Sequence, residues 1–326
     1  MPAPLSVTIS LSPTQRLDTL DVFTALRAEH PSFLTNYPRV LLASHHTTAG
    51  LLDATMRARL QEGEGIQDVL APYRTLFPPH AGYAHDRMAD RDELSPVQRQ
   101  CEPRNADAHL IYLAAGMRNT RLYTTATPHP PVLVDLDGIN NVTGTRRTRY
   151  VTAIGLEAET TLLHRTLQPP HPHHPPAVDL TPLLRRQLRT LPHPDANDAV
   201  RYGRLQVALP DLMPHAALVV NEHEPLLMEH DVAQMLHDPS FAAPSAASVH
   251  AAAGASSVPQ AEPPGSPSSP KDALRLPRTL SIPFVPAPTH SCGYRLVLGR
   301  YQRPLLLRWG GPSDACPLMC MLTQFA

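Results

Sequence analysis

The sequence predicts an α+β fold with two related domains, each a largely antiparallel β-sheet packed with helices. Expected strands follow one another with helices inserted between them, an order typical of antiparallel sheets rather than of regular βαβ alternation. The order helix, strand, polar turn, strand, helix also occurs twice along the chain, which indicates a tandem duplication. A chain of 326 residues is long enough for two such domains with sizeable cores.

The first domain is expected at 1–165. Apolar residues recur at helical spacing over 17–31, and the segment 53–73 predicts one or two further helices. The segment 39–52, RVLLASHHTTAGLL, predicts a buried strand that ends in a polar turn. Further strands of this domain are expected at 7–11, 131–138 and 146–159.

The second domain is expected at 178–326. An amphipathic helix is predicted within 177–191, a strand region at 202–225 and a second helix at 226–238. The remaining β-rich sequence of this domain lies at 279–286, 294–312 and 317–325.

Two stretches have too little apolar sequence to belong to a core. The segment 166–177 is rich in proline and histidine and predicts a stiff, extended linker. The segment 240–271 is a low-complexity run of Ala, Ser and Pro. It buries too little to offset the entropy of ordering, so it is expected to be a disordered insert within the second domain.

Composition excludes several classes of function. Net charge is −1 and aromatic residues make up 5%, so neither nucleic acid nor an anionic membrane is an expected partner. No segment reaches ~18 uninterrupted apolar residues, and the start of the chain lacks the features of a secretory signal. The expected location is the cytoplasm. The four cysteines form no CxxC pair, which argues against a structural zinc site or a disulfide framework.

Three short motifs occur in order along the first domain: HTTAGL at 46–51, YAH at 83–85 and NADAHL at 105–110. A related element, PHAALVVNEHEP, occurs at 214–225 in the second domain. In order and spacing these motifs resemble the YjbQ family, and the chain resembles two diverged copies of it in tandem. The resemblance implies at most a secondary thiamine-phosphate synthase activity. It also implies a homo-oligomer, because members of that family are typically homotrimers.

The two copies differ in complementary ways. When Ala49 is aligned with Ala216, Met213 falls opposite His46, so the second copy lacks that histidine. The same alignment puts Ala54 and Thr55 opposite Asn221 and Glu222, so the first copy lacks the Asn-Glu pair. If there is one site, the first copy is expected to hold its histidines, and Glu222 would be lent to it by the second copy.

The candidate site therefore centres on the histidine motifs. His46, His85 and His109, with Asp107, are the candidate catalytic residues, because imidazoles near their ordinary pKa move protons at neutral pH. The same three histidines are candidate ligands of a divalent metal of unspecified identity. A small phosphorylated molecule is the expected ligand. The candidate ligand-binding residues are Thr47, Thr48, Tyr83, Asn105 and Glu222.

Each of these residues also has a structural interpretation. His46 would be a hydrogen-bonded histidine at a strand end, and Tyr83 a packing residue with a bonded hydroxyl. Asn105, Asp107 and His109 stand at every second position, which fits the wet face of an extended strand as well as a site.

Three functions follow from this pattern. The first is a YjbQ-like small-molecule enzyme that binds a phosphorylated ligand at the histidine cluster. The second is a non-catalytic binding or assembly protein that keeps the fold after losing motif elements. The third is a metal-dependent phosphohydrolase. The true substrate is not given by the sequence.

Overall fold

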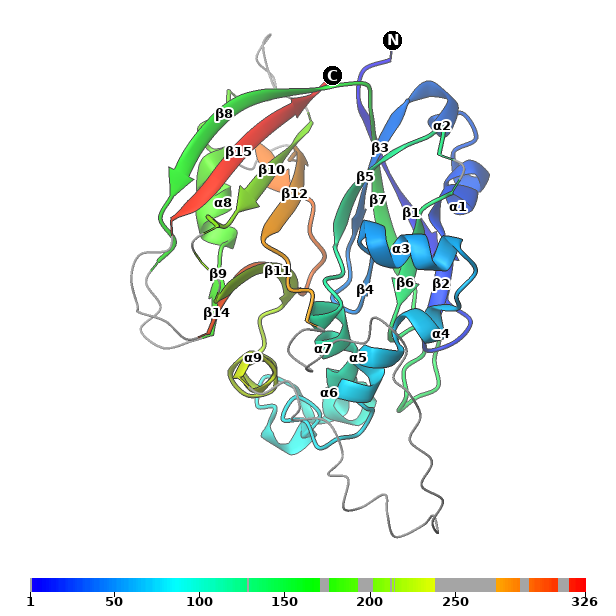
Figure 1. The fold of residues 1–326 in the computed structure, drawn as a ribbon, viewed down its shortest axis with the longest axis vertical. Coiled ribbons are helices and arrows are strands. Elements are labelled where there is room, and N and C mark those ends of the chain that lie inside the picture. Colours follow the sequence, from blue (N-terminus) through cyan, green and yellow to red (C-terminus); the bar gives the residue numbers. More distant parts are fainter. Residues whose placement is uncertain are drawn as a thin grey trace, which may run out of the picture.

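The computed structural model describes residues 2–127, 129–170, 176–192, 202–211, 213, 215–237, 274–287, 293–309 and 317–326. It confirms the α+β class, since helices pack against antiparallel sheets (Figure 1). The segment 240–271, expected to be disordered, lies outside these residues, as does 171–175 in the expected linker. Among the described helices, none is long and apolar enough to cross a membrane.

The first half of the chain forms two sheets, and its helices lie between their strands in the sequence. A four-stranded sheet has the order β1 (Leu5–Leu11), β7 (Arg149–Leu156), β3 (Arg39–Ser44) and β5 (Thr120–Thr124). A three-stranded sheet has the order β2 (Asp18–Asp21), β6 (Val132–Asp135) and β4 (Ala49–Gly50). The helices are α1 (Val22–Glu29), α2 (Phe33–Asn36), α3 (Ala54–Gln61), α4 (Ile66–Val69), α5 (Ala71–Leu76), η1 (Met88–Asp90), α6 (Pro96–Cys101) and α7 (Ala106–Ala114).

The second half repeats this plan. A five-stranded sheet has the order β8 (Glu159–Leu167), β15 (Leu318–Phe325), β10 (Gly203–Ala208), β12 (Thr279–Pro286) and β13 (Tyr294–Leu296). A three-stranded sheet has the order β9 (Ala177–Asp179), β14 (Gln302–Arg308) and β11 (Ala216–Glu222). The helical elements are α8 (Thr181–Leu188), the π-helix η2 (Leu226–Val232) and α9 (Ala233–His237).

The two halves share strand order and register. Strands β1, β7, β3 and β5 correspond in order to β8, β15, β10 and β12, and β2, β6 and β4 correspond to β9, β14 and β11. Ala49 pairs with Asp135 in the first half, and Ala216 pairs with Arg308 in the second. Ala49 and Ala216 thus occupy equivalent places, in agreement with the alignment made from the sequence.

Two local expectations differ from the structure. The sheets divide the chain before the expected boundary at 165, because β8 is a nine-residue strand that pairs with β15 of the second half. The alternating run from Asn105 to His109 is not extended but opens α7. Because all nine residues of α7 are buried, no polar stripe of helical period marks this helix in the sequence.

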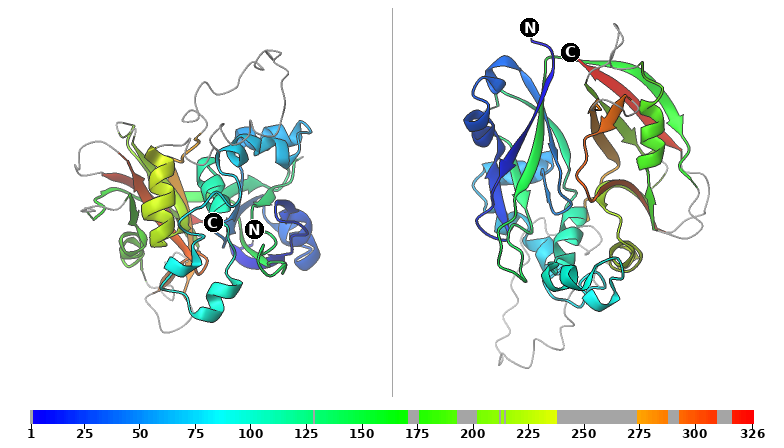
Figure 2. Two further views of the ribbon diagram at one scale, coloured as in Figure 1. Left: turned by 90° about the horizontal axis from the view of Figure 1, so that it is seen from below. Right: turned by 180° about the vertical axis from the view of Figure 1, so that it is seen from behind.

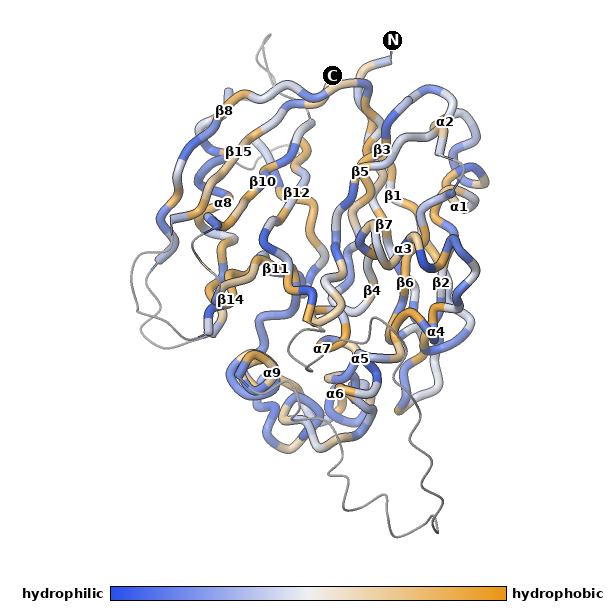
Figure 3. The backbone as a smooth tube through the Cα atoms, viewed as in Figure 1, coloured by the Kyte–Doolittle hydropathy of each residue, from blue (hydrophilic) through white to orange (hydrophobic). Residues whose placement is uncertain are grey.

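The halves pack along two contact regions. Near the chain ends, Leu41 and Ile154 of the first half share an apolar cluster with Val285 and Phe325 of the second. At the other end α7 lies between the halves, as the views in Figures 1 and 2 agree. Figure 3 shows α7 as a largely apolar helix, and its side chains join a core that includes Val219 from β11. This packing brings His109 of α7 against the second half.

Candidate functional site

A cleft of about 900 Å³ lies on the seam between the two halves. The first half contributes the turn at 45–48, the segment around α6 and the start of β7. The second half contributes the end of β11 and the loop before β14. The predicted site residues that line the cleft are His46, Thr47, Thr48, Asn105, His109 and Glu222.

His109 reaches the cleft from α7 and is held by the second half. Its Nδ1 lies 2.7 Å from the Oδ1 of Asn221, and its Nε2 lies 3.9 Å from the Oε2 of Glu222. Because an amide oxygen only accepts, Nδ1 carries the proton and Nε2 keeps its lone pair. Burial, with the charge of His85, lowers the pKa of His109 to about 3. The ring is therefore neutral at neutral pH, and its contact with Glu222 is not an ion pair.

His85 lies behind His109, with ring centroids 5.2 Å apart and ring planes at 67°. Its Nδ1 lies 3.0 Å from the Oε2 of Glu224, and its backbone N–H donates to the carboxylate of Asp231. Burial alone would lower the pKa of His85, but the hydrogen bond to Glu224 and the charges of Glu222 and Glu224 together outweigh it, and the pKa is raised. The pKa of Glu224 is lowered, against the effect of its burial. His85 and Glu224 thus form a buried ion pair across the seam.

His46 has a structural role at the end of β3. Its Nε2 accepts a hydrogen bond from the backbone N–H of Tyr150 at 2.7 Å, and its Nδ1 faces the guanidinium of Arg149 at 3.3 Å. Burial, then the charge of Arg149, lowers the pKa of His46 to about 3. The lone pair of Nε2 is therefore used by the backbone, and Nδ1, which carries the proton of the neutral ring, faces Arg149 rather than the open cleft.

The turn at 46–48 is fixed by the second half. The Nε2 of Gln302 donates to the backbone oxygens of Ser44 and His46, at 3.0 and 2.7 Å. At Gly299 the chain runs so close to the backbone of His45 that a Cβ could not be accommodated. Thr47 and Thr48 are thus held at the cleft by contacts from both halves.

Asp107 and Tyr83 lie away from the cleft. Asp107 forms a bidentate pair with Arg16, at 2.7 and 2.9 Å, and lines a separate pocket of about 270 Å³. Residues two apart on a helix point in directions ~200° apart, so Asp107 and His109 face opposite sides of α7. The hydroxyl of Tyr83 donates to the backbone oxygen of Pro78, and its ring is fully buried.

The cleft also holds an arginine with buried donors. The Nη2 of Arg147 lies 2.8 Å from the Oδ2 of Asp137. Among the described residues, however, neither the Nε nor the Nη2 of Arg147 has a partner in hydrogen-bond geometry. Asp137 also accepts a hydrogen bond from Asn105 at 2.7 Å, and burial raises its pKa to about 6. An anion in the cleft would supply a partner for the Nε of Arg147, whose Nη2 already lies against the carboxylate of Asp137.

Some residues of this site carry no signal in the sequence. Arg91 is 2% exposed, and its guanidinium lies 3.5 Å from the Nε2 of His85. Neither its neighbours in the sequence nor any motif distinguishes it from other arginines. Asp137 follows β6 by two residues, is fully buried, and contacts the cleft residues Arg147 and Asn105 only through the fold.

The residues of the cleft do not fit a divalent metal ion. Within the described ranges, no three His, Cys, Asp or Glu side chains converge in an arrangement that could hold one. The lone pair of His46 Nε2 is taken by Tyr150, the cation Arg149 faces its Nδ1, and Arg91 lies beside His85. A bound metal stays a prediction, which metal analysis of the purified protein would test.

Two solved structures resemble about half of the chain at low similarity. One, from Sulfolobus solfataricus P2, is described as a YbjQ-like protein of unknown function. It is 16% identical, covers 48% of this chain and 99% of its own, and has a TM-score of 0.31. The other is a hypothetical protein from Aeropyrum pernix K1, 20% identical, covering 47% of this chain and 99% of its own, with a TM-score of 0.30.

These likenesses concern the fold at most and assign neither a family nor a function. The sequence matches no protein-family model and no curated protein.

Proposed function

We propose that the chain is an enzyme that binds a small phosphorylated molecule in the seam cleft and moves a proton with His109. One observation carries the proposal. A neutral histidine has its Nδ1 proton fixed by Asn221, while the lone pair of its Nε2 stays available 3.9 Å from Glu222. This is the arrangement of an oriented general base, in which a second group fixes the tautomer of the ring.

The anionic part of the ligand would be held by Arg147. Its Nε is a buried donor without a hydrogen-bond partner among the described residues, its Nη2 lies 2.8 Å from Asp137, and phosphate oxygens suit a planar guanidinium of this kind. Thr47 and Thr48 line the same cleft, and their hydroxyls can donate hydrogen bonds to the phosphoryl oxygens. The cleft is large enough for a metabolite of ordinary size.

A bound anion would also bring His109 into its working range. Burial and the nearby charge of His85 lower the pKa of His109 in the free protein. A negative charge next to the ring favours the imidazolium and raises that pKa. Glu222 would then stabilise the proton taken up by Nε2. Ligand binding and proton transfer are therefore coupled in this proposal.

The two halves contribute different parts of one site. His109 and Arg147 come from the first half, whereas Asn221, Glu222 and Glu224 come from the second. The shared strand order supports an origin by tandem duplication, after which each copy kept part of the original set. By resemblance to the YjbQ family, thiamine-phosphate formation is one reaction to assay, and hydrolysis of phosphate esters is another.

A non-catalytic binding protein is the second candidate. The observation that favours it is the structural use of two predicted catalytic residues, since the Nε2 of His46 accepts from the backbone of Tyr150 and Asp107 is paired with Arg16. In this case the cleft would bind the same ligand without turnover.

Calorimetry with inorganic pyrophosphate, together with turnover assays, separates these candidates. Arg147→Gln should weaken pyrophosphate binding about tenfold, the usual effect of losing a hydrogen bond to a charged group. Arg185→Gln on the exposed face of α8 makes the same change of charge and should leave binding unchanged. The proposal of a ligand site fails if the wild type does not bind pyrophosphate, or if Arg147→Gln binds as the wild type does.

His109→Ala tests the catalytic part. As the loss of a general base, it should lower turnover by about 10² or more. His237→Ala, at an exposed position in α9, is the matched control. Binding of pyrophosphate with no turnover of either substrate class would favour the non-catalytic candidate.

A further inference from the structure

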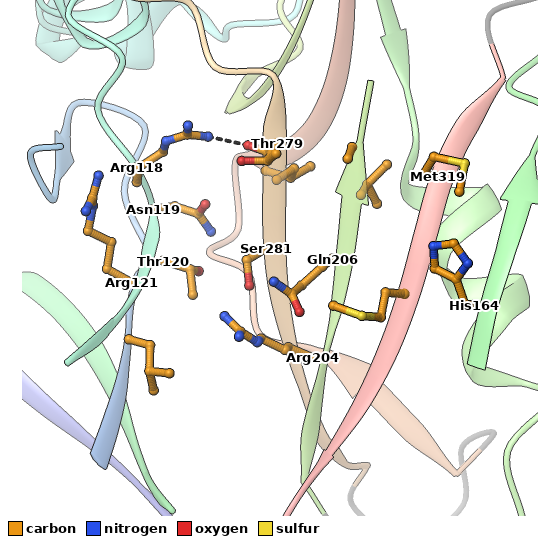
Figure 4. A pocket seen from close by; sticks show the side chains of 15 residues that line it. Arg118, Asn119, Thr120, Arg121, His164, Arg204, Gln206, Thr279, Ser281 and Met319 are labelled. Carbon is orange, nitrogen blue, oxygen red and sulfur yellow. Dashed lines mark hydrogen bonds between the residues drawn. The ribbon is translucent and has the colours of Figure 1, made fainter. Parts of the chain in front are cut away.

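A second cleft, of about 440 Å³, lies between the halves away from the histidines. One wall is formed by the segment from Arg118 into β5. The other is the face of the five-stranded sheet that points away from its own core, carried by β10, β12, β15 and β8. Figure 4 shows side chains from both walls directed into this space. None of its lining residues belongs to the seam cleft.

The charges of this cleft are all positive. Its lining includes Arg118, Arg121 and Arg204 and contains no aspartate or glutamate among the described residues. Arg204 lies 2.7 Å from Glu159, but Glu159 also pairs with Arg39, so this group keeps a net positive charge. The guanidinium of Arg118 donates to the backbone oxygen of Thr279 across the cleft.

Arg118, just before β5, and Arg121, within it, lie in an environment that disfavours their positive charge. Burial, then the nearby charge of Arg121, lowers the pKa of Arg118 to about 10. Burial likewise lowers the pKa of Arg121. Asp53 lies near both guanidinium groups but does not line the cleft, so two half-buried cations face it without a carboxylate in the lining, a setting in which an anion binds favourably.

Four buried polar atoms at this cleft have no hydrogen-bond partner among the described residues. They are the Nδ2 of Asn119, the Oγ1 of Thr120, the Oε1 of Gln206 and the Oγ of Ser281. Asn119 and Thr120 are 3% and 7% exposed. Figure 4 shows these side chains converging from the two walls. Buried polar groups in folded proteins are nearly always bonded, so the donors of Asn119, Thr120 and Ser281 point to a bound acceptor, whereas the Oε1 of Gln206 needs a donor.

The far end of the cleft is less polar. Met319 and Met321 on β15 line it together with Leu122 and Val207. Figure 4 places Met319 and His164 at the end opposite Arg118. Thioethers adapt to apolar groups of irregular shape. The cleft thus offers donors and cations at one end and an apolar surface at the other.

We propose that this cleft binds a small organic anion. Its oxyanion is held by the guanidinium of Arg118 with Asn119, Thr120 and Ser281, and its carbon body lies over Gln206 toward Met319. A carboxylate and a phosphate share this chemistry. The site is independent of the histidine cleft and of the function proposed for it.

A fluorescent organic anion, 8-anilinonaphthalene-1-sulfonate, tests the site in the full-length protein. The wild type should bind it at one saturable site, and hexanoate or hexyl phosphate should displace it while hexanol does not. Displacement by one of the two anions but not the other identifies the oxyanion. Arg118→Gln should weaken binding about tenfold. Arg185→Gln on α8 controls for the change of net charge.

Because Arg118 also bonds to Thr279, a second variant separates binding from folding. Asn119→Ala removes a donor that has no partner among the described residues, so the melting temperature should not fall while affinity does. His109→Ala should bind the probe as the wild type does. No saturable binding, or binding that survives both Arg118→Gln and Asn119→Ala, overturns the proposal. Loss of binding in His109→Ala alone also overturns it, because the probe would then occupy the histidine cleft.

Discussion

The two halves of the chain have the same strand order but carry different functional groups at equivalent places. After β4 the first half enters helices α3 to α7, which bring His85 and His109 to the seam. After β11 the second half enters η2 directly, and Asn221, Glu222 and Glu224 lie at that junction. Neither half holds a base together with the groups that orient it. The comparison teaches that the proposed site is complete only when the two halves are paired.

The largest effect on the unfolding free energy is expected at the contact between His85 and Glu224, which joins the two halves. Glu224→Leu leaves the imidazole of His85 buried without its carboxylate, and loss of one partner of a buried ion pair costs about 3–5 kcal/mol of unfolding free energy. Glu229→Leu, at an exposed position in η2, should change it by less than ~0.5 kcal/mol. Chemical denaturation measures both. Equal, small changes would mean that the halves do not depend on this pair.

Acidification should reveal the structural role of His46. Its pKa is about 3 in the folded protein, so between that value and the ordinary pKa of ~6.5 the unfolded chain binds a proton that the folded chain does not. Stability from this group is therefore present above pH ~6.5 and is lost as pH falls.

His46→Asn should remove this dependence. Between pH ~6.5 and ~4.5, the wild type should lose about 1.4 kcal/mol per pH unit more than the variant does. Unfolding free energies at a series of pH values give the two slopes. Parallel slopes would show that His46 titrates freely in the folded state.

A smaller effect is expected at Gln302, which fixes the HTT turn from the second half. Gln302→Leu leaves the backbone oxygens of Ser44 and His46 without this donor, at a cost of about 1–3 kcal/mol. Arg303→Leu, whose side chain bonds only within its own loop among the described residues, should cost less. A Gln302 variant as stable as the wild type would contradict the view that the second half holds this turn.

The sequence predicts more of the fold than of the site. Strands such as 203–208 and amphipathic helices such as 181–188 are visible from periodicity because each has one buried face. Helix α7 has no such face, since it is buried on every side, and the alternation of Asn105, Asp107 and His109 therefore suggests a strand. Reading this segment as a strand also places Asp107 on the same side as His109, whereas in the helix Asp107 points toward Arg16.

The motifs predict part of the contact between the two halves at the site. The complementary loss of His46 and the Asn-Glu pair suggested that Glu222 lies near the first copy, and in the structure it lies 3.9 Å from His109. Arg91 and Asp137 could not be found in this way, because only tertiary packing brings them to the cleft.

The central claim, a single site shared by the two halves, is tested most directly by a double-mutant cycle between His109 and Glu222. Calorimetric affinity for pyrophosphate is measured for the wild type, His109→Ala, Glu222→Ala and the double variant. A shared site predicts that Glu222→Ala weakens binding as severely as His109→Ala, and that the double variant loses little more than either. Wild-type affinity in Glu222→Ala, or losses that simply add, would contradict the claim.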